Sequence, residues 1–300
     1  MIDARTDPWE PHPDVDVDAI NADLESGKPT VDVAMYYPDN LDPAHHAQVN
    51  VDLLVDGLTR AREIFGRAGV QLRLTWFKTG HLDPSLFAVR ASKPGTDLPM
   101  GGFANMYVQA ERRRSTISDE ARVAFETMIG NPPRSDLIVH VVTLQQVFME
   151  YHEPTVENRI LQPQMIETGG LSFPGYMHGA GMPRGLRGVI TITNLTRTDS
   201  SWKTIAHELG HKLLNVSHEY GETSPQHEVN ADGGLMLYGQ GTDIPSGAEG
   251  RYHYERLHRS PFVYRETDGG ERHYNPDYHT EGFYYDDIYE GISVEFGPGT

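Results

Sequence analysis

The chain has 300 residues, of which 38% are hydrophobic and 23% are charged, so it is long enough for one large globular domain or two small ones. Its formal net charge of −18 disfavours both nucleic acid and anionic membrane surfaces as partners. The absence of cysteine excludes disulfides, thiolate nucleophiles and thiolate zinc sites. No signal peptide and no apolar run of roughly 18 residues is present, so we expect a cytoplasmic protein. Export by a route without a signal peptide would leave the same pattern.

The first third of the chain predicts a strand–helix–strand unit. Residues 1–29 are rich in Pro and Asp and are typical of a tail or strap. The stretch 30–38 alternates as a strand does, and residues 51–65 place apolar side chains at helical spacing. Gly69 stands where a glycine would end that helix, and residues 70–77 alternate again. This order favours a parallel strand pair with a right-handed crossover.

The next part of the chain predicts one more helix and three more strands. Loop-forming stretches rich in Pro and Gly surround a predicted helix at 116–129. The run 135–144 is nearly continuously apolar, as in a buried central strand. Residues 169–176 predict a short edge strand, and 188–195 predict another alternating strand. Together these elements predict an α/β fold with a mixed, mostly parallel twisted sheet. The last 50 residues are dense in Tyr and His without periodicity, which indicates a loop-rich C-terminal part.

The stretch "TIAHELGHKLLNVSHEY" at residues 204–220 carries the clearest chemical signal. His207 and His211 are one helical turn apart, about 6 Å along the axis, so both imidazoles can reach one ion. Glu208 lies between them and can reach a water on that ion. This pattern, H-E-x-x-H, supplies two zinc ligands and a general base. A solvated helix face is the alternative, but the motif follows a predicted strand and lies opposite an apolar stripe formed by Trp202, Ile205, Ala206, Leu209 and Leu213.

The stretch resembles the zinc motif of the metzincin metallopeptidases, H-E-x-x-H-x-x-G-x-x-H. In that family the glycine ends the helix in a left-handed turn, and the third histidine returns to the metal. Here Leu214 and Ser217 occupy those two positions. Asn215, however, precedes His218 by three residues, and Asn is tolerant of positive φ. We therefore expect a helix one residue longer, ended by Asn215, with His218 as the third ligand. The rival ligands are Glu219, His227, Glu228 and Asp232.

Two further features extend the resemblance. Metzincins carry a methionine in a tight turn beneath the zinc histidines, and "GGLMLYG" at 233–239 is similar, with Met236 in that role. Tyr238 follows two residues later, and in the astacin and serralysin branches a tyrosine at that place binds zinc or stabilises the oxyanion. The alternatives are a methionine that fills the core and an ordinary buried tyrosine.

The order of elements before the zinc helix resembles the pappalysin-type branch. There the edge strand lies antiparallel to the bound substrate, which implies strand addition along a short backbone segment. The residues that match this segment are Gly170, Leu171, Ser172 and Phe173.

The resemblance implies a zinc-dependent endopeptidase with one catalytic Zn²⁺ and a peptide or protein substrate. His207, His211 and His218 would hold the metal, Glu208 would act as the general base, and Tyr238 would stabilise the oxyanion. The implied organisation is an N-terminal tail or strap at 1–29, an upper catalytic subdomain at 30–218 that ends in the zinc helix, and a loop-rich lower subdomain at 219–300 below the cleft, with the Met-turn.

Other functions fit parts of the same pattern. A zinc amidase, or another hydrolase of a non-protein amide in a biosynthetic pathway, would use the same water chemistry. A non-catalytic module with structural zinc would not need Glu208. A toxin or effector protease without a signal peptide would still be a peptidase. His12 or Asp14 in the N-terminal segment is a candidate latch on the metal, and the sequence does not indicate an oligomeric state.

Overall fold

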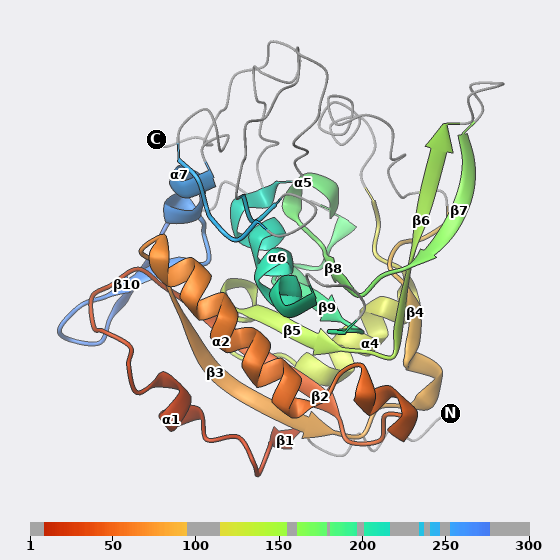
Figure 1. Ribbon diagram of the computed structural model, residues 1–300, viewed down its shortest axis with the longest axis horizontal. Helices are drawn as coiled ribbons and strands as arrows, with labels where there is room; N and C mark the ends of the chain where they lie inside the picture. The colour runs from red at the N-terminus through yellow and green to blue at the C-terminus, as the bar shows by residue number, and fades with distance from the viewer. Residues whose placement is uncertain are drawn as a thin grey trace.

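The computed structural model describes residues 9–94, 115–154, 161–178, 181–196, 201–216, 234–236, 241–246 and 253–276. Over these residues the protein is a mixed α/β structure built on a mostly parallel sheet, with helices on both faces (Figure 1). This agrees with the fold class that the sequence predicts. None of the described helices is both long and apolar enough to cross a membrane.

The main sheet has the strand order β1-β3-β2-β5-β9-β8, with the hairpin β10–β11 joined to the N-terminal end of β2. The pairs β2–β3, β2–β5 and β5–β9 are parallel, whereas β1, β8, β10 and β11 pair antiparallel. In chain order the strands are β1 (Glu10–Pro11), β2 (Thr30–Pro38), β3 (Gln71–Gly80), β5 (Val139–Thr143), β8 (Gly170–Ser172), β9 (Val189–Ile192), β10 (Val263–Glu266) and β11 (Arg272–Tyr274).

Every residue of β2, β5 and β9 is buried. Parallel strands covered on both faces have this property, because the crossover helices shield each side from water. The continuous apolar runs in the sequence follow from this position in the sheet. The edge strand β8 is only partly buried, which leaves its outer side as one boundary of the sheet.

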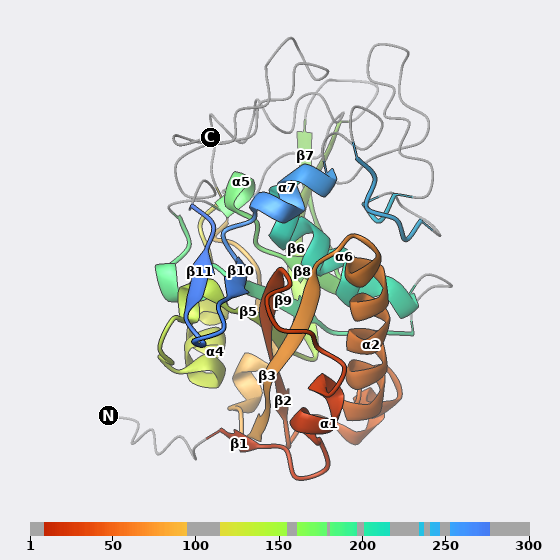
Figure 2. The ribbon, with the colours of Figure 1, turned by 90° about the vertical axis from the view of Figure 1, so that its left-hand side faces the viewer.

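Helices cover both faces of the sheet (Figure 2). α2 (Val51–Arg67) and α6 (Thr204–Gly210) lie together on one face, and α4 (Asp119–Ile129) lies on the other. A Cβ atom added at Gly57 would lie 2.7 Å from Cδ1 of Ile205, so the glycine permits the close approach of α2 to α6. The remaining α-helices are α1 (Val17–Asn21), α5 (Gly175–His178) and α7 (His253–Arg259), and short 3-10 turns lie at Pro43–Ala47, Pro84–Leu86, Ser135–Leu137, Arg184–Leu186 and Ser201–Lys203.

The strand–helix–strand unit β2–α2–β3 confirms the prediction from the first third of the chain. The Asn50 side chain accepts a hydrogen bond from the Leu53 amide at 2.9 Å, which caps the start of α2. Gly69 has a φ of 78°, the left-handed conformation expected of a helix-ending glycine. The two strands then pair in parallel along their whole length.

A second sheet was not predicted from the sequence. Its strand order is β4-β6-β7, and the antiparallel hairpin β6–β7 projects away from the main sheet (Figure 1). The strands are β4 (Ala88–Arg90), β6 (Gln146–Pro154) and β7 (Leu161–Glu167). Both hairpin strands contain proline and charged residues, so their sequences lack the regular alternation that signals a strand.

Four sequence predictions need correction. The predicted edge strand at 169–176 is a strand only over Gly170–Ser172, because Gly175–His178 forms the helix α5. The predicted strand at 135–144 begins as a 3-10 turn and becomes a strand only at Val139. The segment expected to be a tail or strap contains β1, which pairs with β3, and the helix α1. The loop-rich C-terminal part contributes the hairpin β10–β11, in which Val263 pairs with Val31 of the main sheet. The proposed boundary after residue 218 lies outside the described residues and stays a prediction.

Candidate metal centre

The helix that carries the H-E-x-x-H motif is anchored by its apolar side. Ile205, Ala206, Leu209 and Leu213 have no exposed surface and belong to the hydrophobic core. α6 continues after Gly210 as a single π-helical turn, His211–Asn215. Turns of this kind are rare and occur often at functional sites. Asn215 has a φ of 53°, so it ends the helix in the left-handed conformation that the sequence predicts, and Val216 is extended.

The imidazoles of His207 and His211 lie side by side, with ring centroids 4.7 Å apart and planes at 84°. The Nδ1 atom of His207 is 2.9 Å from the carbonyl oxygen of Leu235, and Nδ1 of His211 is 2.7 Å from that of Val216. A carbonyl oxygen only accepts, so each Nδ1 carries the hydrogen and donates it. Each Nε2 therefore holds a lone pair, which is the arrangement usual for histidines that bind a metal.

Burial keeps both rings neutral. Desolvation is the main cause that lowers the pKa of His207 to about 4; the hydrogen bond to Leu235 opposes it, and the charge of Lys203 adds to it. Desolvation and the neighbouring His207 lower the pKa of His211 to about 3. Neutral imidazole is the form that binds a metal, so near neutral pH the two rings are ready to act as ligands.

Glu208 is buried beside the edge strand. Desolvation raises the pKa of its carboxyl group to about 8, although a hydrogen bond from the Ser172 amide and the charge of Lys212 partly offset this rise. A Cβ atom added at Gly170 would lie 2.9 Å from both Cγ and Oε1 of Glu208. The backbone of β8 thus lies directly against the carboxyl-bearing side chain, and only glycine fits at position 170.

The register of β8 shows which backbone groups face outward. The Thr193 amide donates to the Gly169 carbonyl at 2.9 Å, so these two residues form a hydrogen-bonded pair next to the ladder. Antiparallel pairs alternate between hydrogen-bonded and non-hydrogen-bonded positions. Gly170 and Ser172 occupy the alternate positions, so their amides and carbonyls point away from β9. The outward amide of Ser172 is the one that reaches Glu208.

Met236 packs against the helix at Gly210, the residue before His211. It has no exposed surface and belongs to a short turn that follows Gly234. A Cβ atom added at Gly210 would lie 2.5 Å from its sulfur atom. The amide of Leu235 donates to the Asp243 carbonyl at 2.7 Å, which fixes the turn. The carbonyl of the same Leu235 accepts the hydrogen bond from His207. The turn predicted around Met236 therefore supports one of the two imidazoles directly.

The predicted third ligand His218 and the tyrosine Tyr238 lie outside the described residues. So do the rival ligands Glu219, His227, Glu228 and Asp232. Among the residues that the structure does describe, no group of three or more His, Asp or Glu side chains is arranged to hold a metal. The structure therefore describes two of the three predicted ligands, and the third stays a prediction.

The latch hypothesis for the N-terminal segment is wrong for the two residues named. His12 packs against Phe77, with ring centroids 5.6 Å apart, and Asp14 follows it on the same segment. This segment pairs with β3 through β1, at one end of the sheet order, whereas β8 and Glu208 lie at the other end. Neither side chain can reach the histidine pair.

Sequence reasoning missed two buried lysines on this helix. The Nζ atom of Lys203 donates to the Gly241 carbonyl at 2.7 Å, and Nζ of Lys212 donates to the carbonyls of Phe173 and Arg187. The signal was present, since Lys212 lies three residues after Leu209 and seven after Ile205, beside the apolar stripe of the helix. His253 in α7 was also missed, and its charge contributes to the low pKa of His211.

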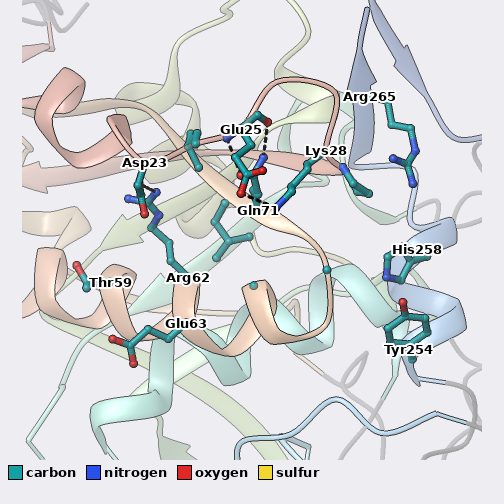
Figure 3. A pocket seen from close by; sticks show the side chains of 15 residues that line it. Asp23, Glu25, Lys28, Thr59, Arg62, Glu63, Gln71, Tyr254, His258 and Arg265 are labelled. Atoms are coloured by element: carbon teal, nitrogen blue, oxygen red, sulfur yellow. Dashed lines mark hydrogen bonds and ion pairs between the residues drawn. The ribbon is translucent and has the colours of Figure 1, made fainter.

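A cavity of about 660 Å³ lies elsewhere, between the end of α2, the loop before β2, and α7 (Figure 3). Its charged walls compensate one another, because Lys28 pairs with Glu25 and Arg62 pairs with Asp23. It shares no residue with the histidine pair, so it is a separate feature of the surface.

Comparisons with known proteins do not assign the chain to a family. No family model matches the chain, and no curated protein matches it.

Proposed function

We propose that this protein is a zinc-dependent endopeptidase of the metzincin type. The observation that carries the proposal is the pair of neutral imidazoles whose Nδ1 atoms donate to backbone carbonyls, next to the buried carboxyl group of Glu208. Supporting features are the left-handed Asn215, the turn around Met236 and the antiparallel edge strand β8. His218 is the proposed third ligand, and the proposed substrate is a peptide or protein.

His207 and His211 would hold the zinc through their Nε2 atoms, because their Nδ1 atoms are already used. Zinc, when bound, supplies a Lewis acid that polarises the scissile carbonyl and makes water a better nucleophile near neutral pH. A cation next to Glu208 also favours its ionised form, which opposes the effect of burial. Glu208 then accepts a proton from the attacking water and donates it to the leaving amine.

The edge strand would bind the substrate by strand addition. Gly170 and Ser172 turn their backbone groups away from β9, so an extended peptide can pair with the amide and carbonyl of Gly170 and with the carbonyl of Ser172. The Ser172 amide is engaged by Glu208, which places the general base at the same edge where the peptide would lie. Tyr238 is proposed to stabilise the oxyanion.

The principal test is digestion of a diverse peptide library by the zinc-loaded protein. We expect wild type to cleave extended peptides and Glu208→Gln to be slower by a factor of at least about 10². Glu126→Gln, on the exposed surface of α4, is the matched control and should be as active as wild type. Hydrolysis of small amides without cleavage of peptides would instead favour the amidase. Full activity of Glu208→Gln would rule out the mechanism.

Metal content provides a second test. His207→Ala and His211→Ala should lose zinc, whereas His81→Ala, at an exposed position, should keep it. His218→Ala, compared with Glu219→Ala and His227→Ala, would identify the third ligand. Zinc retained at wild-type affinity in His207→Ala would mean that the metal binds elsewhere.

A further inference from the structure

Lys212 follows His211 in the helix and is almost completely buried, with 2% of its surface exposed. Its Nζ atom donates to the carbonyl oxygen of Phe173 at 2.5 Å and to that of Arg187 at 2.6 Å. Both acceptors belong to the backbone. An amine supplies two N–H groups whether or not it carries the additional proton, so both hydrogen bonds are available in either form.

The two acceptors lie at the same end of the β8–β9 pair. Phe173 directly follows β8, and Arg187 precedes the first residue of β9 by two positions. In the antiparallel register Ser172 lies opposite Ile190, so the chain leaves β8 close to where it enters β9. Lys212 therefore binds both ends of the connection between the two strands and links them to the helix.

The same helix contacts the edge strand at a second point. Glu208 is one turn before Lys212, and its carboxyl group accepts from the Ser172 amide. Glu208 thus binds the amide of Ser172, and Lys212 binds the carbonyl of the following residue, Phe173. Without Lys212, the carbonyls of the buried Phe173 and the half-buried Arg187 would each lose this donor, which is costly away from water.

We propose that Lys212 is a positioning residue that holds the edge strand β8 at a fixed distance from the helix of the metal site. The role in substrate binding rests on the proposed function, because β8 is the proposed peptide-binding strand. The contact itself does not depend on the reaction. Lys212 touches neither the proposed metal nor the substrate, and it acts through the backbone of Phe173 and Arg187.

Hydrogen exchange in zinc-loaded protein tests the contact. We expect the two hydrogen-bonded amides of the edge strand, those of Leu171 and Ser172, to exchange about tenfold faster, or more, in Lys212→Met than in wild type. Lys203→Met is the matched control, since it removes another buried lysine, at the N-cap of α6, that binds the Gly241 carbonyl instead. Exchange of the Leu171 and Ser172 amides should not change in that control. Wild-type exchange in a folded Lys212→Met protein would overturn the proposal.

Kinetics with an extended peptide test the consequence. In Lys212→Met the KM should rise about tenfold, with zinc content unchanged and a smaller change in kcat. Lys212→Arg retains donors for both carbonyls and should recover part of the loss. A fall in kcat with unchanged KM would overturn the strand-positioning role. If wild type cleaves no peptide, the proposed function fails, whereas the exchange experiment still decides the role of Lys212.

Wild-type protein gives a further test if Lys212→Met does not fold. If Lys212 holds β8 to the helix, the two open together, so the Leu171 and Ser172 amides should exchange with opening free energies similar to those of Leu209 and Leu213. Exchange of these two amides that is far faster than in the helix would overturn the proposal.

Discussion

Two of the buried groups of ionisable side chains in the described part of the chain are built in opposite ways. On β2, the Asp32 carboxylate accepts hydrogen bonds from Arg73, Arg272 and Tyr264, at distances between 2.7 and 3.0 Å. On the helix of the proposed metal site, Glu208 and Lys212 bind backbone groups of the edge-strand region. The first cluster compensates charge with charge and joins β2, β3 and the β10–β11 hairpin. The second keeps its ionisable groups in a perturbed state, as is common at functional sites.

The two clusters have opposite effects on the stability of the metal-free protein near neutral pH. The pKa of Glu208 is raised from 4.5 to about 8 in the folded protein. The folded state therefore binds more protons than the unfolded state between these values, so this group lowers stability as pH rises through that window. A bound cation would relieve this cost. In the metal-free protein, the site thus reduces stability near neutral pH, whereas the Asp32 cluster supports the fold.

The largest expected effect on stability is in the Asp32 cluster. Asp32→Asn removes the charge that two arginines share, and the free energy of unfolding should fall by about 3 kcal/mol. Asp56→Asn is the control, because its pair with Arg60 is exposed on α2 and should contribute less than about 0.5 kcal/mol. Urea denaturation measures both. Equal effects would show that burial does not distinguish the two ion pairs.

The next effect concerns the contact between strand and helix. Gly170→Ala would place a methyl group within 3 Å of Glu208 and Thr204, so the free energy of unfolding should fall by about 1 to 3 kcal/mol. Peptidase activity should fall with it. Gly66→Ala, where an added Cβ meets nothing within 4 Å, should instead stabilise α2 by about 0.5 to 1 kcal/mol. An active, stable Gly170→Ala protein would contradict the close packing of β8.

A third prediction uses a buried histidine away from the site. Burial lowers the pKa of His140 from 6.5 to about 4, so the unfolded chain binds the extra proton first as pH falls. Its contribution to stability is complete above pH 6.5 and is lost as pH falls towards 4. The stability of His140→Gln should depend less steeply on pH in this window, by up to about 1.4 kcal/mol per pH unit. Thermal unfolding at several pH values, in the presence of a chelator, would measure the slope.

The smallest expected change in stability is at Gly210. In Gly210→Ala the new methyl group would press on the Met236 sulfur, but alanine also favours the helix, so stability should change by less than about 1 kcal/mol. Zinc affinity should nevertheless fall by about tenfold or more, because the same turn carries the carbonyl that orients His207. Unchanged zinc affinity would show that the Met236 turn does not influence zinc binding.

Some elements were predictable because their signal is local. The apolar spacing of residues 51–65 and the glycine at position 69 specify α2 and its end. The left-handed helix end at Asn215 was predicted from the resemblance to the metzincin motif, together with the tolerance of Asn for positive φ. The hairpin β6–β7 gave no such signal, because proline and charged residues interrupt the alternation in its strands. The two strands are defined by their pairing with each other. The hairpin β10–β11 was missed for a similar reason, since its place depends on a distant partner, β2.

The sequence by itself determined the kinds of atoms at the site: two imidazoles one turn apart, a carboxylate between them, and an apolar stripe that buries the opposite side of the helix. These follow from helix periodicity, which is a property of neighbouring residues. Only the tertiary structure decided the state of those atoms. The carbonyls of Leu235 and Val216 fix which nitrogen of each ring holds the lone pair, and the burial of Glu208 against β8 raises its pKa. Hydrogen bonding and desolvation depend on groups that are distant along the chain, so no local pattern records them.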